Sequence, residues 1–152
     1  MFLGEENKLS IIRASLDDTQ QIYDWQCHPE TRRYALTTKI PNWIEHQNWM
    51  NLKLTSVDDF FYMIKSSEEG KSVGVIRLDR IKKAEYLVSI FVSPEHYGQG
   101  IAKWALKYLD NIHRNVTIHA TVLEANIASQ KLFTSANYQQ ASFDTFIRLP
   151  IN

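Results

Sequence analysis

Several features that mark other classes of protein are scarce or missing in this sequence of 152 residues. Cysteine occurs once, as Cys27, and one thiol can form neither an internal disulfide nor a zinc site, which suits a reducing compartment. Basic and acidic residues number 17 each, and a net charge of zero disfavours non-specific binding to nucleic acid. No apolar run approaches the roughly 20 residues of a membrane helix, and no signal peptide is evident. We therefore expect a cytoplasmic protein that uses no metal and binds neither nucleic acid nor membrane.

What the sequence does contain is typical of one soluble globular domain. Its length suffices for a substantial core within a single domain, which we expect to span residues 1–152. Hydrophobic residues make up 44% and charged residues 22%, both ordinary shares. Aromatic residues are fairly dense at 12%, and we expect most of them in the core, with a few left for the wall of a pocket.

The first part of the chain predicts a strand followed by two helices. A short strand is expected over residues 9–15, where Ser15 and Asp18 then form a capping-box-like start to a helix. Residues 27–41 break the helical period and predict a loop or a short, irregular helix. Pro41 suits the first turn of a second helix, whose apolar residues continue to Leu54.

From residue 60 onward the apolar period changes to that of strands, and helices return later. The expected elements are an antiparallel meander of strands at 60–66, 72–81 and 84–92, a helix at 97–115, a strand at 116–123, a helix at 126–135 and a last strand or hairpin at 139–149. Because a helix connects them, we expect the strands at 84–92 and 116–123 to be parallel. The order βααβββαβαβ predicts an α/β (α+β) fold with a mixed sheet and helices on both faces.

Two glycines, Gly98 and Gly100, stand two apart just before the helix that begins near residue 101. Glycines let the free N–H groups of a helix N-terminus approach an anion, and the helix dipole adds partial positive charge there. This unit can cradle a pyrophosphate, but an ordinary turn explains the same pair equally well. His96, beside the glycines, is expected to be exposed.

The stretch VSPEHYGQGIAKWAL, residues 92–106, resembles the acyl-CoA-binding motif of the GNAT family of N-acetyltransferases, Arg/Gln-x-x-Gly-x-Gly/Ala between a strand and a helix. The places of that motif are occupied by Tyr97, Gly98, Gln99, Gly100, Ile101 and Ala102, with Tyr97 replacing the usual Arg or Gln. The resemblance implies that backbone amides from Gln99 to Lys103 hold the pyrophosphate. It also implies that the pantetheine arm lies along Phe91, Val92 and Ser93.

A second stretch, NIASQKLFTSANY at residues 126–138, resembles the later motif of the same family. The resemblance implies that Asn126 faces the coenzyme A arm and that Ser129 lies near it. Phe133 stands where the family often has a tyrosine that protonates the departing thiolate, and a phenyl ring has no proton to give. Asn137 replaces a glycine, and Asn adopts left-handed backbone angles more readily than most residues.

These two motifs, at the family's separation, resemble a GNAT domain over nearly the whole chain. The resemblance implies a sheet of six to seven strands that splays between its fourth and fifth strands, where the pantetheine arm enters. It implies an acetyl-CoA-dependent transfer of an acetyl group directly to a primary amine, with acetyl-CoA as cosubstrate and no metal. A non-catalytic acyl-CoA-binding module is the alternative, favoured by Phe133 and Tyr97. The sequence leaves open a monomer or a homodimer.

Three short stretches of the first half resemble a narrower branch that acetylates the 4-amino group of a UDP-linked amino sugar in the pseudaminic-acid pathway. They are WQCHPETRRY at 25–34, IEHQNWM at 44–50 and VGVIRLD at 73–79. The resemblance implies a nucleotide-linked amino sugar as the acceptor. Ribosomal-protein N-terminal acetyltransferases and spermidine acetyltransferases share the helical opening, so protein N-termini and polyamines remain alternatives. A neutral chain argues against a highly cationic polyamine, which would prefer an acidic pocket.

Five side chains are candidates for the chemistry or for the acceptor. Glu85 is a candidate general base, because an amine must lose a proton to attack a thioester, although a plain surface carboxylate is an equal alternative. His46 either lines the acceptor pocket as a catalytic group or packs between helices. Arg33 is a candidate clamp for a nucleotide-sugar phosphate. Arg77 either points into the cleft as part of the acceptor site or pairs with Asp79 or Glu85, and Trp25 serves as core or pocket wall.

Overall fold

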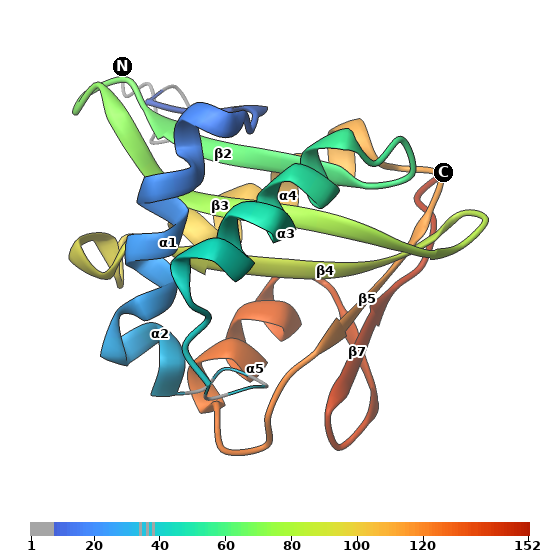
Figure 1. Cartoon of the computed structure of the whole chain (residues 1–152). Coiled ribbons are helices and arrows are strands. Elements are labelled where there is room, and N and C mark those ends of the chain that lie inside the picture. Colours follow the sequence, from blue (N-terminus) through green and yellow to red (C-terminus); the bar gives the residue numbers. More distant parts are fainter. Residues whose placement is uncertain (1–7, 34, 36, 38) are drawn as a thin grey trace.

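The computed structural model describes residues 8–33, 35, 37 and 39–152, and its strands form one seven-stranded sheet in the order β1-β2-β3-β4-β5-β7-β6 (Figure 1). The strands are β1 (Leu9–Arg13), β2 (Phe60–Ser66), β3 (Lys71–Lys82), β4 (Glu85–Val92), β5 (Thr117–Thr121), β6 (Gln139–Ser142) and β7 (Thr145–Arg148). The helices are α1 (Thr19–Cys27), α2 (Pro29–Arg33), α3 (Trp43–Thr55), α4 (Ile101–Ile112) and α5 (Ile127–Ser135), with short 3-10 turns η2 (Leu16–Asp18) and η3 (Pro94–His96). The predicted fold class is confirmed.

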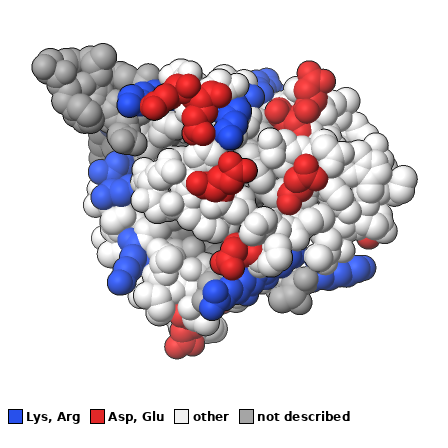
Figure 2. Space-filling view, turned by 90° about the vertical axis from the view of Figure 1, so that its left-hand side faces the viewer, with Lys and Arg blue, Asp and Glu red and all other residues white. Residues whose placement is uncertain are grey.

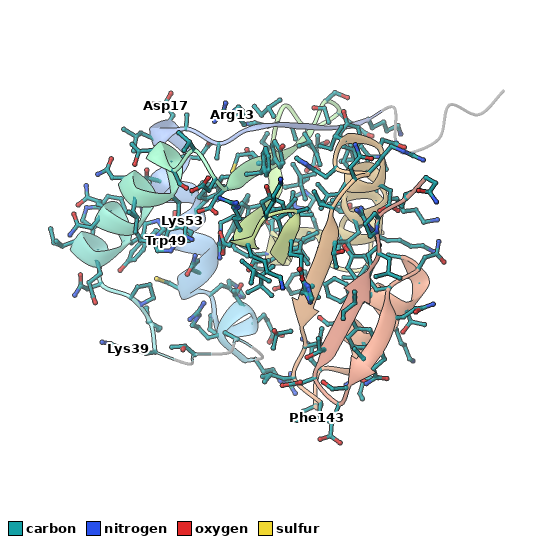
Figure 3. All side chains as sticks on the ribbon, turned by 90° about the vertical axis from the view of Figure 1, so that its right-hand side faces the viewer. Arg13, Asp17, Lys39, Trp49, Lys53 and Phe143 are labelled. Carbon is teal, nitrogen blue, oxygen red and sulfur yellow. The ribbon has the colours of Figure 1, made fainter. Side chains whose placement is uncertain are left out.

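The pairing of the strands confirms the predicted topology. β1, β2, β3 and β4 pair in antiparallel succession, β4 and β5 are parallel, and β5, β7 and β6 are again antiparallel. The predicted last strand is the hairpin of β6 and β7, with Phe143 at its tip (Figure 3). Because α4 connects β4 to its parallel neighbour β5, the crossover covers one face of the sheet.

The alternation of side chains divides the core between the two faces of the sheet. On one face, α4 buries Ile101, Ala105, Leu106 and Leu109, the four residues predicted to share one side of this helix. On the other face, Ile22 and Trp25 of α1 and Met50 of α3 meet inward residues of β2 and β3. Each fully buried leucine or isoleucine side chain stabilises the fold by about 1.5–3 kcal/mol through the hydrophobic effect. Both faces of the sheet are therefore covered, as predicted.

Capping residues set the starts of the helices on the α1 face. Ser15 and Asp18 form the predicted capping box, but it opens the turn η2 before α1 begins at Thr19. The prediction that Pro41 belongs to the first turn of the second helix is wrong. Asn42 is the N-cap of α3, and its side chain accepts a 2.8 Å hydrogen bond from the N–H of Glu45, so Pro41 precedes the helix.

Candidate active site

The pairing between β4 and β5 is short, and it leaves a gap in the sheet. Three residue pairs join the strands, Glu85 with Thr117, Tyr86 with Ile118 and Leu87 with His119. β4 continues to Val92 along β3, whereas β5 turns toward β7, and the two strands diverge (Figure 1). The predicted splay between the fourth and fifth strands is therefore confirmed.

The edge of β4 that faces this gap presents backbone donors and acceptors. The N–H of Ser93 donates to the carbonyl of Val73 at 2.8 Å, which sets the side of the strand that bonds to β3. Successive peptide groups of an antiparallel strand alternate in direction, so the carbonyl of Val88 and the peptide groups of Ile90 and Val92 point into the gap. Of the three residues predicted along pantetheine, only Val92 turns its peptide groups this way. An extended ligand can pair with such an edge as another strand would.

The predicted cradle follows β4 at the start of α4. Gly98 and Gly100 have φ angles of +78° and +76°, in the left-handed region that favours glycine, and Gly100 is the N-cap of α4. The first helical bond of α4 runs from the N–H of Trp104 to the carbonyl of Gly100 at 3.0 Å. Among the described residues, no hydrogen-bond partner occupies the N–H groups of residues 101–103. A Cβ atom at either glycine would meet nothing within 4 Å, so these donors face open space that fits an anion.

A hydrogen bond from a buried histidine holds this loop against the turn between β2 and β3. His96 is 4% exposed, which corrects the expectation that it is exposed. Its ring points beneath the loop, where Nε2 lies 2.7 Å from a carboxylate oxygen of Glu69. Lys71, the first residue of β3, lies 3.5 Å from the carboxylate of Glu95. The segment just before the glycines therefore has two attachments to the end of this turn.

The second motif places the start of α5 beside the same gap. Asn126 is the N-cap of α5, and its side-chain oxygen accepts a 3.1 Å hydrogen bond from the N–H of Ser129. α4 follows β4 and α5 follows β5, so the N-termini of both helices lie at the carboxyl ends of a parallel pair of strands. In sheets of this kind ligands bind at that edge. The topology therefore puts the glycine loop and the start of α5, with Asn126 and Ser129, at the same edge of the sheet.

Phe133 lies away from open surface. It is 5% exposed and packs edge-on against Tyr138 at 5.1 Å between ring centroids, with Phe146 at 6.1 Å. Burial raises the pKa of Tyr138 well above its ordinary value, and its hydroxyl has no hydrogen-bond partner among the described residues. Phe133 therefore sits in an aromatic core beneath α5 and supplies no acidic group.

On the α3 face, a polar network reaches the part of β4 that borders the gap. Arg77 donates from Nε to Asp79 at 2.9 Å and from Nη2 to the hydroxyl of Ser89 at 3.3 Å. Lys53 of α3 donates to Asp79 at 3.1 Å, and the Arg77 guanidinium lies 4.9 Å from the ring centre of Trp49. Figure 3 shows Trp49 and Lys53 on α3. We call Trp49, Lys53, Arg77, Asp79 and Ser89 the Arg77 network.

The charges of the network determine the ionisation of its carboxylate. Burial alone raises the pKa of Asp79, but the hydrogen bonds and charges of Arg77, followed by those of Lys53, outweigh it and hold the pKa below its usual value. Asp79 is therefore ionised at neutral pH and keeps Arg77 in place beside Ser89. The guanidinium has five N–H donors in a planar fork, and one carboxylate cannot bind all of them. Donors therefore remain for a ligand.

The structure places the other predicted acceptor residues away from one another. His46 is 2% exposed and donates from Nε2 to the carbonyl of Thr19 at 2.9 Å, which fastens α3 to α1. Burial lowers the pKa of His46, against a smaller effect of that hydrogen bond, so the ring is neutral. Trp25 is buried against Phe91 of β4, with ring centroids 6.1 Å apart. These are packing contacts.

Arg33 ends α2 with an exposed side chain. Tyr34, the last residue of the stretch at 25–34, lies outside the described residues. The face seen in Figure 2 carries acidic and basic side chains interspersed across a largely uncharged surface. A field of one sign therefore does not dominate this side of the molecule.

Glu85 begins β4 and is engaged at both carboxylate oxygens. His119 Nε2 lies 2.9 Å from Oε1, and Lys82 Nζ lies 3.2 Å from Oε2. The hydrogen bond from His119, followed by that from Lys82, lowers the pKa of Glu85. The sequence analysis did not identify His119. The alternation of VTIHATVL, which puts His119 on the face opposite the buried Ile118 and Ala120, could have indicated it.

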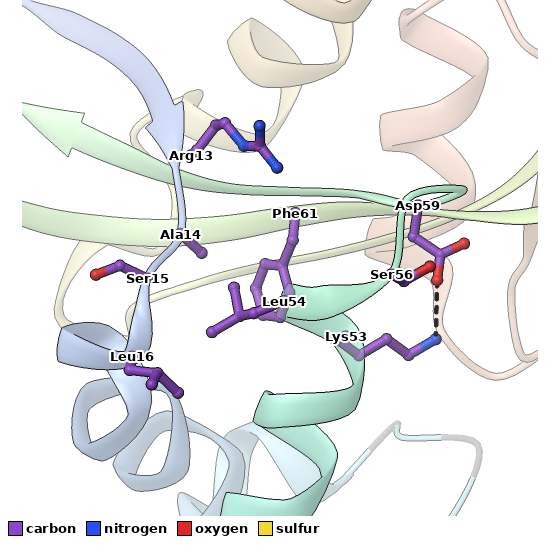
Figure 4. A pocket seen from close by; sticks show the side chains of 9 residues that line it. All are labelled: Arg13, Ala14, Ser15, Leu16, Lys53, Leu54, Ser56, Asp59 and Phe61. Atoms are coloured by element: carbon purple, nitrogen blue, oxygen red, sulfur yellow. Dashed lines mark ion pairs between the residues drawn. The ribbon is translucent and has the colours of Figure 1, made fainter.

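A small pocket of about 150 Å³ lies elsewhere on the α3 face (Figure 4). Its lining comes from the end of β1, the turn η2, the end of α3 and the start of β2, and includes Lys53 with its partner Asp59 at 3.7 Å. No residue of the glycine loop, β4 or β5 lines it. The gap is the better candidate because it combines free backbone donors with two helix N-termini.

In the described part of the chain, no helix is long and apolar enough to cross a membrane.

Residues 8–139 match the family described as the acetyltransferase (GNAT) domain, and the chain therefore belongs to this family. An uncharacterized protein of Methanocaldococcus jannaschii is 25% identical over 144 residues, which are 91% of this chain and 29% of that protein. The chain thus spans less than a third of the length of this curated relative. The predicted family is confirmed.

Two solved structures share the fold. Spermidine N-acetyltransferase from Vibrio cholerae, in complex with coenzyme A and spermine, superposes with a TM-score of 0.85 over 94% of this chain and 96% of its own, at 13% identity. The ribosomal L7/L12 alpha-N-protein acetyltransferase RimL, in complex with coenzyme A, gives a TM-score of 0.80 over 97% of both chains, at 12% identity. At these identities the likeness establishes the fold and leaves the acceptor open.

Proposed function

We propose that this protein is an acetyl-CoA-dependent N-acetyltransferase that moves an acetyl group directly to a primary amine. The observation that carries the proposal is the gap between β4 and β5. Its edge offers the carbonyl of Val88 and the peptide groups of Ile90 and Val92, and the N-termini of α4 and α5 flank its mouth. Membership of the GNAT family supports the same chemistry.

The residues of the gap fit the two ends of acetyl-CoA. The N–H groups between Gln99 and Lys103, at the positive end of α4, bind the pyrophosphate, and the left-handed glycines leave the approach open. Ile90 and Val92 pair with the amides of the pantetheine arm, and Asn126 borders it from α5. Bound acetyl-CoA supplies the activated acetyl thioester. An N–H on the free edge of β4 polarises its carbonyl, as an oxyanion hole does.

The acceptor that we favour is a nucleotide-linked amino sugar. The supporting observation is Arg77, whose guanidinium lies beside Ser89 and is held by Asp79 and Trp49. A guanidinium in this position binds a phosphate in bidentate fashion and repels a polyamine. A protein N-terminus or a polyamine is the alternative, since those are the acceptors named for the two structural neighbours.

The second candidate function is a non-catalytic acyl-CoA-binding module. The observation in its favour is Phe133, which is buried among aromatic rings and has no proton for a departing thiolate. In the catalytic proposal, a water molecule protonates the thiolate instead.

The test is a thiol-release assay with acetyl-CoA and a panel of amines, comprising a UDP-linked amino sugar, spermidine and a peptide with a free N-terminus. We expect turnover with the amino sugar at kcat/KM at least tenfold above the others. Preference for spermidine or the peptide would overturn the acceptor but not the chemistry. Binding of coenzyme A by calorimetry without turnover on any amine would favour the non-catalytic module. Absence of binding at millimolar coenzyme A would overturn both.

A further inference from the structure

Glu85 and His119 meet at the closed end of the gap. His119 belongs to the last residue pair of the β4–β5 ladder, opposite Leu87. Side chains alternate along both strands, so Glu85 and His119 project from the same face, the one that carries Ser89 and the Arg77 network. Their contact of 2.9 Å therefore lies where the strands part.

The length of the free edge places the reacting end of a bound ligand near this pair. A ligand anchored at the glycine loop that follows the edge of β4 passes Val92 first, then Ile90, and reaches the end of the edge at Val88. Val88 is one residue from Leu87, a step of about 3.3 Å along the strand. The far end of such a ligand therefore lies beside His119, the residue that faces Leu87.

The hydrogen bonds of the pair assign different roles to the two side chains. Both oxygens of Glu85 are occupied, by His119 and by Lys82, and the carboxylate is stabilised in its ionised form. A carboxylate only accepts, so His119 donates from Nε2 and carries its proton there. Nδ1 of His119 then has a free lone pair, and it has no partner among the described residues. The side chain is 24% exposed.

We propose that His119 Nδ1 is the base that removes a proton from the acceptor amine, and that Glu85 is a positioning residue that fixes the ring. The inference rests on the proposed function and deepens it. The arrangement follows the general rule that the hydrogen bond at one ring nitrogen selects the tautomer and frees the other nitrogen.

The proton balance of the step is complete. The ammonium form of the acceptor gives one proton to His119 Nδ1, directly or through one water, and the freed lone pair forms the C–N bond. The C–S bond breaks, and its electron pair leaves with sulfur. The new amide nitrogen loses its second proton to the thiolate through water, and His119 returns its own proton to solvent.

The charged groups that face His119 are few among the described residues. Glu85 comes from β4, and Lys82 acts through Glu85 from the end of β3. On β7, the residue paired with His119 is Ile147, whereas Arg148 is buried on the opposite face with Asp110. Among the described residues, Glu85 is thus the charged group that bonds to His119.

The experiment compares His119→Gln, Glu85→Gln and the control His113→Gln, using the amine of the panel that wild type acetylates best. General bases contribute about 10²–10⁴ in rate, so we expect His119→Gln to lower kcat about 100-fold and to remove the acidic limb of the kcat–pH profile. Binding of coenzyme A by calorimetry should stay within threefold. Glu85→Gln should lower kcat by about tenfold, because the ring loses the carboxylate that fixes its Nε2–H tautomer.

The control removes a histidine that is not part of this pair. His113, at the end of α4, bonds to the hydroxyl of Tyr62 at 2.8 Å, and His113→Gln should keep the acidic limb of wild type. Nitrogen-15 NMR of the neutral ring should report the Nε2–H tautomer for His119 in wild type and a mixture of tautomers in Glu85→Ala.

Three outcomes separate this inference from the proposed function. Wild-type turnover combined with an unchanged kcat and pH profile in His119→Gln would overturn the inference alone. Loss of activity in Glu85→Gln equal to that in His119→Gln, with a single tautomer retained in Glu85→Ala, would assign the base to Glu85 and also overturn it. A wild type that turns over no amine would overturn the proposed function, and this inference with it.

Discussion

The two sides of the gap differ in the kind of group they present. The side that we propose for the coenzyme consists of backbone, with the N–H groups at the start of α4 and the free edge of β4. The side that we propose for the acceptor consists of side chains, with the Arg77 network from α3, β3 and β4 and the pair of Glu85 and His119. Backbone donors depend on local conformation and side-chain networks on long-range packing, so the two sides should respond differently to substitution.

The largest effect is expected on the coenzyme side. Gly100→Glu places a carboxylate in front of the free N–H groups and forces a residue with a Cβ into a φ of +76°, so affinity for coenzyme A should fall at least 100-fold in calorimetry. Asn111→Glu adds the same charge at the other end of α4 and should leave the affinity within twofold. Equal losses in both variants would show that net charge matters, and not the position of the donors.

A second variant tests whether the acceptor side can be changed alone. Arg77→Gln removes the guanidinium beside Ser89, and KM for the acceptor should rise about tenfold, since a hydrogen bond to a charged group contributes about 1.5–3 kcal/mol. Affinity for coenzyme A should not change. The control is Arg80→Gln on the same strand, where Arg80 pairs with Asp58 at the surface. An equal rise of KM in the control would remove Arg77 from the acceptor site.

The Phe133→Tyr variant tests whether a tyrosine at this position can protonate the departing thiolate. The new hydroxyl would enter the aromatic core around Tyr138 and Phe146, where an unpaired polar group costs about 1–3 kcal/mol. We expect a lower melting temperature and no gain in kcat, measured by thermal unfolding and by thiol release. A higher kcat would mean that position 133 reaches the departing sulfur after all.

The smallest effect concerns the stability of the acceptor side at acidic pH. The pKa of Asp79 is lowered in the folded state, so its contribution is present above the unfolded value of about 3.9 and is lost as pH falls through the lower folded pKa. Asp79→Asn should therefore reduce stability at pH 7 and leave it nearly unchanged below that window. Denaturant unfolding at the two pH values measures the difference, and parallel losses at both would contradict it.

The same contrast explains what could be predicted from the sequence. The glycines and the strand before them are local signals, and together with the family resemblance they predicted the parallel crossover and the splay. His46, His96 and His119 were different, because their partners are Thr19, Glu69 and Glu85, each 27 or more residues away in the chain. Only the folded register brings such pairs together, so sequence periodicity left His46 ambiguous, misjudged His96 and missed His119.

The three-pair ladder between β4 and β5 has a further consequence for the free protein. Without a ligand, the sheet behaves as two smaller sheets joined at Glu85–Leu87, and amide protons beside the joint should exchange with solvent faster than those in the middle of β3. A bound pantetheine arm fills the place of a missing strand. The bound cosubstrate then stabilises the junction between the two halves of the sheet, and the melting temperature of the protein should rise with the cosubstrate concentration.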